Sequence, residues 1–169
     1  MPRYDGSTMH IDVDRLGVVG LHSTARLLDQ LPLARPDCPP PPRALVFKCS
    51  HLVSRDPPVT PTFPSRHPSD RRLREAKRLR AGEALVKAFC RHIAHNSHLL
   101  SLEVLSAPLR LFDFQQLAAG LLHNGCQLRH LDLTGSRLGD AGLAAFGPTL
   151  LTQHKLVFLS LSGCGTRLG

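Results

Sequence analysis

The pattern Leu-x-x-Leu-x-Leu occurs three times in the second half of the chain, once with valine in the last place, and it restricts the fold more than any other feature. The first residues of the copies, Leu99, Leu128 and Leu156, are 29 and 28 residues apart. A near-constant period of this length predicts a repeat protein in which each repeat is one supersecondary unit. The apolar positions are Leu99, Leu102 and Val104, then Leu128, Leu131 and Leu133, then Leu156, Leu159 and Leu161.

Each copy predicts a short strand followed by a helix. In the second copy Leu131 and Leu133 alternate with polar residues, which is the period of a strand buried on one face. Downstream apolar residues recur at helical spacing and predict one buried stripe. The predicted stripes are Leu117, Leu121 and Leu122 in the first copy, and Leu143, Phe146, Leu150 and Leu151 in the second. We expect Pro148 to interrupt the second helix because it lacks an N–H, and Gly125 to end the first.

The segments LRHLDLTGSRLGDAGLAAF and LLSLEVLSAPLRLFDFQQLAAGL resemble the long, ribonuclease-inhibitor-like class of leucine-rich repeat. This resemblance implies an α/β solenoid built from strand–helix repeats of about 28 residues. In that class Asn or Cys commonly follows the strand, at the position held here by Cys164, whereas the other copies carry Ser136 and Ala107. The alternative is an amphipathic α/β domain with chance periodicity.

The first half of the chain predicts more divergent parts of one module spanning residues 1–169. Residues 1–33 resemble a degenerate first repeat, with a strand at 9–13 and a helix ended by Pro32. The apolar face of that helix is predicted to contain Leu21, Ala25, Leu28 and Leu31. Residues 34–69 predict a proline-rich connection, a strand at 44–48 with Leu45 and Phe47 inward, and a mobile insertion.

Residues 70–98 predict a helix with two different halves, capped near Ser69 or Asp70. Leu85, Phe89 and Ile93 recur every four residues, so the later half should pack on the sheet while the earlier half projects past it. Six cations crowd the earlier half, in a chain of net charge +8: Arg71, Arg72, Arg74, Lys77, Arg78 and Arg80. This basic patch is either a solvated helix face or a contact for an acidic partner, an import receptor or nucleic acid. Nucleic acid is disfavoured because the chain has no Trp and one Tyr for base stacking.

Alignment of the copies predicts an outward surface on the sheet. The three rows are Ser101, His130 and Phe158; Glu103, Asp132 and Ser160; and Leu105, Thr134 and Ser162. Stacked strands form a concave face suited to protein contacts, so the first two rows are the candidate partner-binding residues. An exposed Phe158 would be the anchor of such a contact. The alternative is that these side chains only keep the sheet soluble.

Signatures of catalysis and of metal binding are absent from the sequence. There is no phosphate-binding loop, nucleophile elbow or His-Glu-x-x-His motif, so we expect a non-enzymatic protein with no cofactor. Five cysteines without a Cys-x-x-Cys pair indicate neither a disulfide framework nor a zinc site. Asp113, Asp132 and Asp140 are expected in loops or on exposed strand positions.

The order of segments adds an expectation about location. IDVDRL, AGEALVKAFCRHI, LEVL, LDLTG and LSLSGCG follow one another as in the amino-terminal repeats of centrosomal leucine-rich-repeat proteins, which the chain resembles. The resemblance implies a scaffold that recruits protein partners at centrosomes or ciliary basal bodies. No long apolar run or signal segment is present, which favours a cytoplasmic protein without a membrane span. Regulators of GTPases or other enzymes share this repeat architecture and remain an alternative.

The third copy reaches its strand and then stops before a helix can form after Cys164. The last repeat is therefore expected to be truncated, with leucines that lack part of their cover. An exposed strand edge beside uncovered leucines favours pairing with another chain, so we expect self-association at this end.

Overall fold

The computed structural model describes residues 2–4, 7–31, 41–49, 68–107, 109–123 and 127–165. These residues form an α/β structure in which a single sheet has the strand order β1-β2-β3-β4-β5-β6. The strands are β1 (Arg3–Tyr4), β2 (Thr8–Asp12), β3 (Ala44–Lys48), β4 (Ser101–Leu105), β5 (His130–Asp132) and β6 (Phe158–Ser160). The helices are α1 (Val18–Gln30), α2 (Pro68–His95), α3 (Leu111–His123) and α4 (Gly139–Thr152), with a short 3-10 turn at Val13–Arg15.

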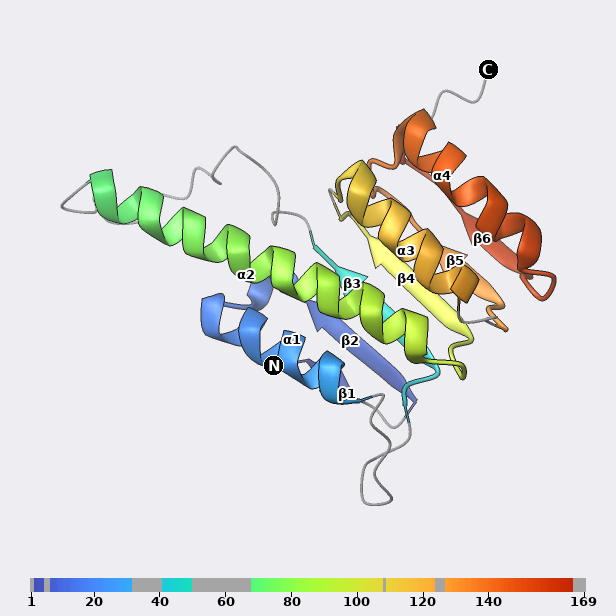
Figure 1. Ribbon diagram of the computed structural model, residues 1–169, viewed down its shortest axis with the longest axis horizontal. Coiled ribbons are helices and arrows are strands. Elements are labelled where there is room, and N and C mark those ends of the chain that lie inside the picture. Colours follow the sequence, from blue (N-terminus) through green and yellow to red (C-terminus); the bar gives the residue numbers. More distant parts are fainter. Residues whose placement is uncertain are drawn as a thin grey trace.

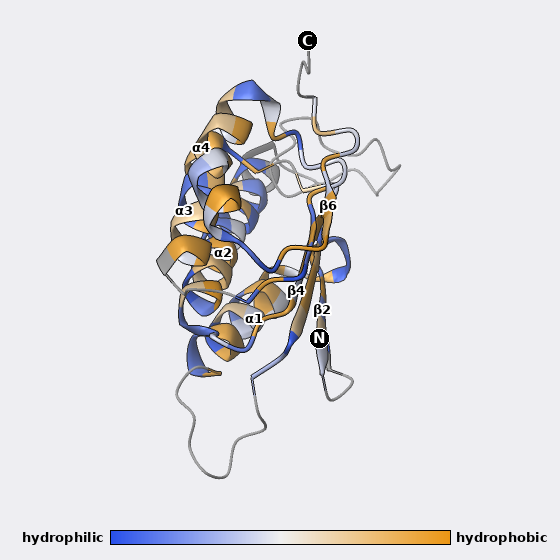
Figure 2. Ribbon diagram, turned by 90° about the vertical axis from the view of Figure 1, so that its right-hand side faces the viewer, coloured by the Kyte–Doolittle hydropathy of each residue, from blue (hydrophilic) through white to orange (hydrophobic). Residues whose placement is uncertain are grey.

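Strands β2 to β6 are parallel, and one helix stands between each strand and the next. Parallel neighbours need such a crossover, so the chain alternates strand and helix as the sequence predicts. The four helices lie side by side on one face of the sheet (Figures 1 and 2). Strand β1 is the exception, because it pairs antiparallel with β2 and is the outermost strand on that side.

The hydrophobic core lies between the sheet and the helix layer. Alternate residues of each inner strand point into it, which confirms the predicted inward positions at Leu45 and Phe47. From the helix side, Leu85, Phe89 and Ile93 are buried as their spacing predicts. The rings of Phe47 and Phe89 meet with centroids 4.6 Å apart, which joins β3 to α2. Leu102, Val104, Leu131 and Leu133 are fully buried by the same alternation.

A repeated turn follows β4, β5 and β6. Ser106, Gly135 and Gly163 occupy equivalent positions, and all three have positive φ angles of 53°, 70° and 65°. One residue later, Ser136 donates a hydrogen bond from Oγ to the Val104 carbonyl oxygen at 2.5 Å. Cys164 donates from Sγ to the Leu133 carbonyl oxygen at 2.8 Å. Ser136 thus makes the same kind of contact to the preceding unit as Cys164, whereas Ala107 has no polar group to do so.

Three predictions about the helical stripes are wrong. Leu122 and Leu151 are 49% and 81% exposed, because a residue next to a core leucine is rotated by about 100° around the helix. Pro148 lies inside α4, which continues to Thr152. Thr149 is buried beside it and donates to the Ala118 carbonyl oxygen of α3 at 3.1 Å, so this contact helps hold the helix across the proline. Gly125 lies outside the described residues.

The amino-terminal elements agree with the sequence except in detail. The first parallel strand spans Thr8–Asp12 instead of 9–13, and the buried Val13 begins the 3-10 turn. Leu21, Ala25 and Leu28 of α1 are buried as predicted, and Leu31 packs partly buried against the core. Strand β3 has the predicted bounds. Pro32, the proline run and the predicted insertion lie outside the described residues.

Helix α2 begins at Pro68, so Ser69 and Asp70 lie inside it instead of capping it. Proline is favoured in the first helical turn, where its missing N–H has no intrahelical partner to lose. The helix ends at His95, before the predicted 98. Its first half extends beyond the sheet, as Figure 1 shows. Its second half is joined to α1 by an ion pair between Arg91 Nη2 and Asp29 Oδ1 at 3.4 Å.

Candidate functional site

The face of the sheet opposite the helices is called here the open face (Figure 2). Its residue rows follow from the strand register. Ser101 pairs with His130, which pairs with Phe158, and Glu103 pairs with Asp132, which pairs with Ser160. The first two rows predicted by aligning the repeats are therefore rows of the sheet, because strands in one register bring equivalent residues side by side.

The same rows continue into β2 and β3, which sequence analysis did not include. The row of Ser101 is extended by Thr8 and Ala44. The row of Glu103 is extended by His10 and Val46, and the row of Leu105 by Asp12 and Lys48. Neither strand carries the Leu-x-x-Leu-x-Leu pattern, so an alignment of repeats could not find these six residues. The alternation of buried Met9, Ile11, Leu45 and Phe47 was the signal that could have placed them.

An exposed pair of rings marks the β6 end of the open face. The imidazole of His130 stacks on the phenyl ring of Phe158, with centroids 4.2 Å apart and planes 6° from parallel. Phe158 remains 45% exposed. Glu103 Oε1 lies 3.9 Å from His130 Nε2, so a carboxylate stands on the other side of the imidazole. This arrangement offers an apolar aromatic surface next to a negative charge.

The second row is held by a hydrogen-bonded group. Asp132 Oδ1 accepts from the backbone N–H of Thr134 at 2.9 Å and from its hydroxyl at 2.5 Å. The Thr134 and Ser160 hydroxyl oxygens are 2.8 Å apart. Because the Thr134 proton goes to Asp132, the Ser160 hydroxyl is the donor in this last contact. Asp132 is thus a fixed acceptor on a half-buried strand position.

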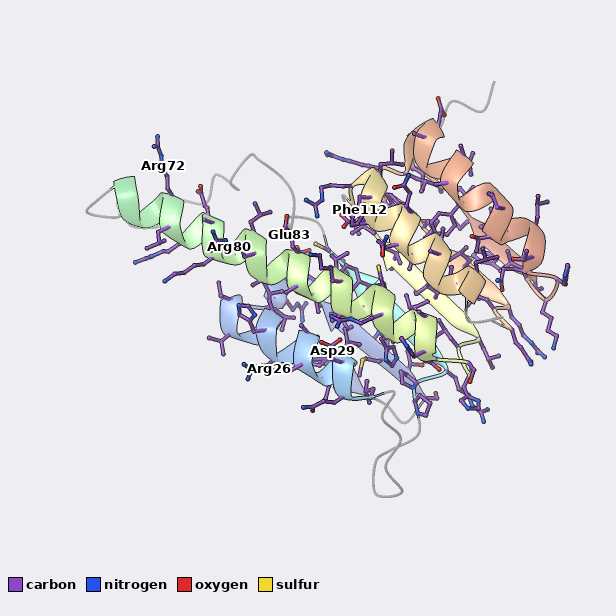
Figure 3. The ribbon with its side chains drawn as sticks, in the orientation of Figure 1. Arg26, Asp29, Arg72, Arg80, Glu83 and Phe112 are labelled. Carbon is purple, nitrogen blue, oxygen red and sulfur yellow. The ribbon has the colours of Figure 1, made fainter. Side chains whose placement is uncertain are left out.

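The basic patch lies away from the open face. Arg72, Arg74, Lys77 and Arg80 are exposed on the projecting half of α2, which belongs to the helix layer (Figure 3). Arg78 is half-buried, and its Nε has no hydrogen-bond partner within the described part of the chain. The side chain of Arg71 lies outside the described residues. The two predicted sites are therefore separate, one on each side of the sheet.

Asp113 is a correction, because it is neither in a loop nor exposed. It lies in the first turn of α3 and is 5% exposed. Its Oδ2 accepts from the backbone N–H of Arg110 at 3.0 Å and from Arg110 Nε at 3.1 Å, while Arg110 Nη1 donates to Glu83 at 2.9 Å. The Asp113 carboxylate, followed by that of Glu83, raises the pKa of Arg110. Asp140 is exposed in the first turn of α4, also not in a loop.

Buried titratable groups occur in the helix layer, where they are structural. Burial lowers the pKa of His92 to about 4, and burial together with the Asp113 charge raises the pKa of Cys90 to about 12. A thiol with such a pKa is a poor nucleophile. Cys49, Cys90 and Cys164 are buried, whereas Cys38 and Cys126 lie outside the described residues.

Neither a metal site nor a membrane-spanning helix is present in the part of the chain that the structure describes. No group of three or more His, Cys, Asp or Glu side chains there is placed to hold a metal ion. No helix there combines the length and apolar character needed to cross a bilayer.

Comparisons with protein-family models, with curated proteins and with solved structures found no match to this chain. The open face near β6 combines an aromatic pair, the carboxylates of Glu103 and Asp132, and hydroxyl groups within two adjacent rows. Such a set can contact a protein surface through apolar area, ionic attraction and hydrogen bonds.

Proposed function

We propose that this chain is a non-enzymatic protein-interaction module of the leucine-rich-repeat type, and that its partner protein docks on the open face around Phe158. The observation that carries the proposal is the stacked His130–Phe158 pair, in which Phe158 stays 45% exposed although its phenyl ring is apolar. Aromatic side chains held rigid before binding contribute area at low entropic cost. They are over-represented among the residues that dominate interface energies.

The chemistry of the surrounding residues suggests the kind of partner. Glu103 beside the ring pair favours a cationic side chain, which gains both ionic attraction and a cation–π contact when it lies over a ring. Asp132 and Ser160 provide hydrogen-bonding positions in the next row. The expected partner surface therefore presents an arginine or lysine next to apolar area.

The test is affinity capture from a cell lysate with three purified baits: the wild-type chain, the double variant Phe158→Ala/Glu103→Ala, and the control Leu122→Ala. Leu122 is exposed to a similar extent but lies on α3, in the helix layer. The proposal requires a protein retained by the wild type and the control but lost from the double variant. Circular dichroism must show all three baits folded alike. Equal retention on all three baits would contradict a site on the open face.

Location is a second part of the proposal. The order of segments that resembles centrosomal leucine-rich-repeat proteins supports a scaffold at the centrosome or ciliary basal body. Fluorescence microscopy of the tagged chain beside a centriole marker tests this. A diffuse signal in ciliated and dividing cells would refute the location without affecting the proposed binding face.

A second candidate is an acidic partner at the basic patch. It is favoured by one observation: Arg72, Arg74, Lys77, Arg78 and Arg80 form no ion pair within the described residues. Binding at this site would weaken steeply as salt is raised. It would disappear when Arg72, Arg74 and Lys77 are replaced by Gln, while capture by the open face should persist.

A further inference from the structure

The outward side chains of the open face divide by charge across the sheet, and the cations lie on β1 to β3. Lys48 of β3 is exposed and follows buried Phe47, so its side chain lies on the open face. Arg3 of β1 is exposed and pairs with His10, which is itself exposed next to buried Ile11. Residues that pair directly across two strands share a face. These three strands therefore contribute two cations to the open face.

The carboxylates of the open face lie on β4 and β5. Glu103 and Asp132 pair with each other in one row, and both are half-buried on the outward side. The Glu103 carboxylate is 3.9 Å from His130 Nε2, and Asp132 accepts a hydrogen bond from the Thr134 hydroxyl. None of the outward residues of β4 and β5 is Lys or Arg. This half of the face therefore contributes two negative charges.

One carboxylate, that of Asp12 on β2, lies on the cationic side of the face. Arg15 Nε is 3.0 Å from Asp12 Oδ2, so the protein itself already matches this charge. Arg3 and Lys48, by contrast, make no ion pair within the part of the chain that the structure describes. The strands of the open face are therefore positive on β1 to β3 and negative on β4 to β5.

Two apolar side chains, Val46 and Leu105, stand where the two halves meet. Val46 pairs with Glu103, and Leu105 pairs with Lys48, so each lies next to one of the charges. Both are half-buried and face outward. An apolar centre with charged groups around it is the common arrangement of a protein–protein interface.

A partner whose charge has a single sign does not fit this surface. A nucleic acid or an anionic membrane would neutralise Arg3 and Lys48, but it would also bring phosphate groups against Glu103 and Asp132. A protein segment can carry both signs of charge. Because the two signs lie on different strands of the open face, such a segment has to cross the strands instead of running along one of them.

We propose that the open face binds a protein segment that crosses the strands, with acidic residues over β1 to β3, an apolar residue over Val46 and Leu105, and basic residues over β4 and β5. This inference rests on the proposed function and adds to it a second contact area and a direction. Neighbouring strands are about 4.8 Å apart, so the centres of the two halves are about 12 Å apart. The acidic and basic residues of the partner are then separated by about eight residues in a helix, or about four in an extended segment.

Selection from a random library of peptides of about 20 residues, long enough to cover both halves as a helix, tests the proposal on the immobilised chain. The wild type should enrich peptides in which an acidic cluster and a basic cluster are separated. Lys48→Glu should abolish selection for the acidic cluster and keep that for the basic one, whereas Glu103→Lys should do the reverse. Lys87→Glu, at an exposed position of α2 in the helix layer, is the matched control and should select the same peptides as the wild type. A selected peptide should bind Lys48→Glu roughly tenfold more weakly than it binds the wild type or the control.

Several results would overturn the proposal, provided that circular dichroism shows all variants folded alike. Selected peptides that carry only a basic cluster and depend on Phe158 and Glu103 would refute this inference while the proposed function stands. Peptides that bind Lys48→Glu as tightly as the wild type would exclude the cationic half from the contact. Double-stranded DNA or phosphatidylserine vesicles that bind the wild type but not Lys48→Glu would identify a polyanion as the occupant of that half. A selection that enriches no peptide, or only peptides insensitive to Lys48, Phe158 and Glu103, would refute both proposals.

Discussion

The rings of His130 and Phe158 stack although the two residues are separated by one whole repeat of the chain. They belong to neighbouring parallel strands and occupy the same position in each, so the register of β5 and β6 brings them together. The same register aligns buried Leu131 with Leu159 on the other side of the sheet. One geometric relationship thus organises both the core and the candidate binding surface.

The pattern of burial predicts that leucines in the core and on the helix surface differ greatly in tolerance to substitution. Leu133→Gln places an amide where the side chain is fully buried and should lower the free energy of unfolding by about 3–5 kcal/mol. Leu122→Gln, at a position 49% exposed, should change it by less than about 1 kcal/mol. Urea denaturation of both variants measures the difference. Similar losses would show that the assigned inward and outward positions are incorrect.

The hydroxyl of Ser136 should contribute measurably to stability. Ser136→Ala removes the buried hydrogen bond to the Val104 carbonyl and should cost about 1–2 kcal/mol. Ser136→Cys should retain most of the stability, because Cys164 makes the corresponding contact to Leu133 with a thiol. Chemical denaturation of the two variants provides the comparison. If alanine and cysteine behave alike, the contact between repeats is not energetically important.

The carboxylate of Asp113 caps the beginning of α3 and holds Arg110. Asp113→Ala should lower the free energy of unfolding by about 2–3 kcal/mol, since several hydrogen bonds to a nearly buried charge are lost. Asp140→Ala, in the exposed first turn of α4, is the matched control and should cost less than about 1 kcal/mol. Thermal melts monitored by circular dichroism distinguish the two. A larger shift for Asp140 would refute the assigned roles.

His92 should make the fold sensitive to mild acid. Its pKa falls from 6.5 to about 4 on burial in the folded chain, so only the unfolded chain takes up the proton between these values. Stability is therefore complete above pH 6.5 and declines as the pH falls, by up to about 3 kcal/mol near pH 4. His92→Gln should flatten this part of the profile, whereas His154→Gln, at an exposed position, should not. Urea unfolding from pH 7 to pH 4 gives both profiles, and parallel slopes for wild type and His92→Gln would contradict the prediction.

Much of the fold could be predicted because the sheet has a period of two. Burial on one face left alternating residues in strands β2 to β5, and the repeat spacing brought Ser101, His130 and Phe158 into one row. The helical stripes were predicted less well. Pairs such as Leu121 and Leu122 carry the same side chain, and the sequence alone does not show which of the two faces the sheet.

Other features depend on contacts between distant residues. Strand β1 is two residues long and has no period to detect, and its partner is set by pairing with β2. The burial of Asp113 depends on Arg110 and on Glu83 of the preceding helix. The stacking of His130 on Phe158 could be expected from the register, but its parallel ring geometry could not.

The repeated turn after each strand limits where the chain can change in length. The ends of α3 and α4, His123 and Thr152, are 29 residues apart, whereas Leu128 and Leu156 are 28 apart, so the additional residue of the longer unit stands before Leu128. The number of residues between each strand and its turn is constant. An insertion there would remove Gly135 from its left-handed conformation and Ser136 from its hydrogen bond to the Val104 carbonyl oxygen. Insertions during evolution, or loops added by design, should therefore be accepted where a helix leads into the next strand and rejected between a strand and the turn that follows it.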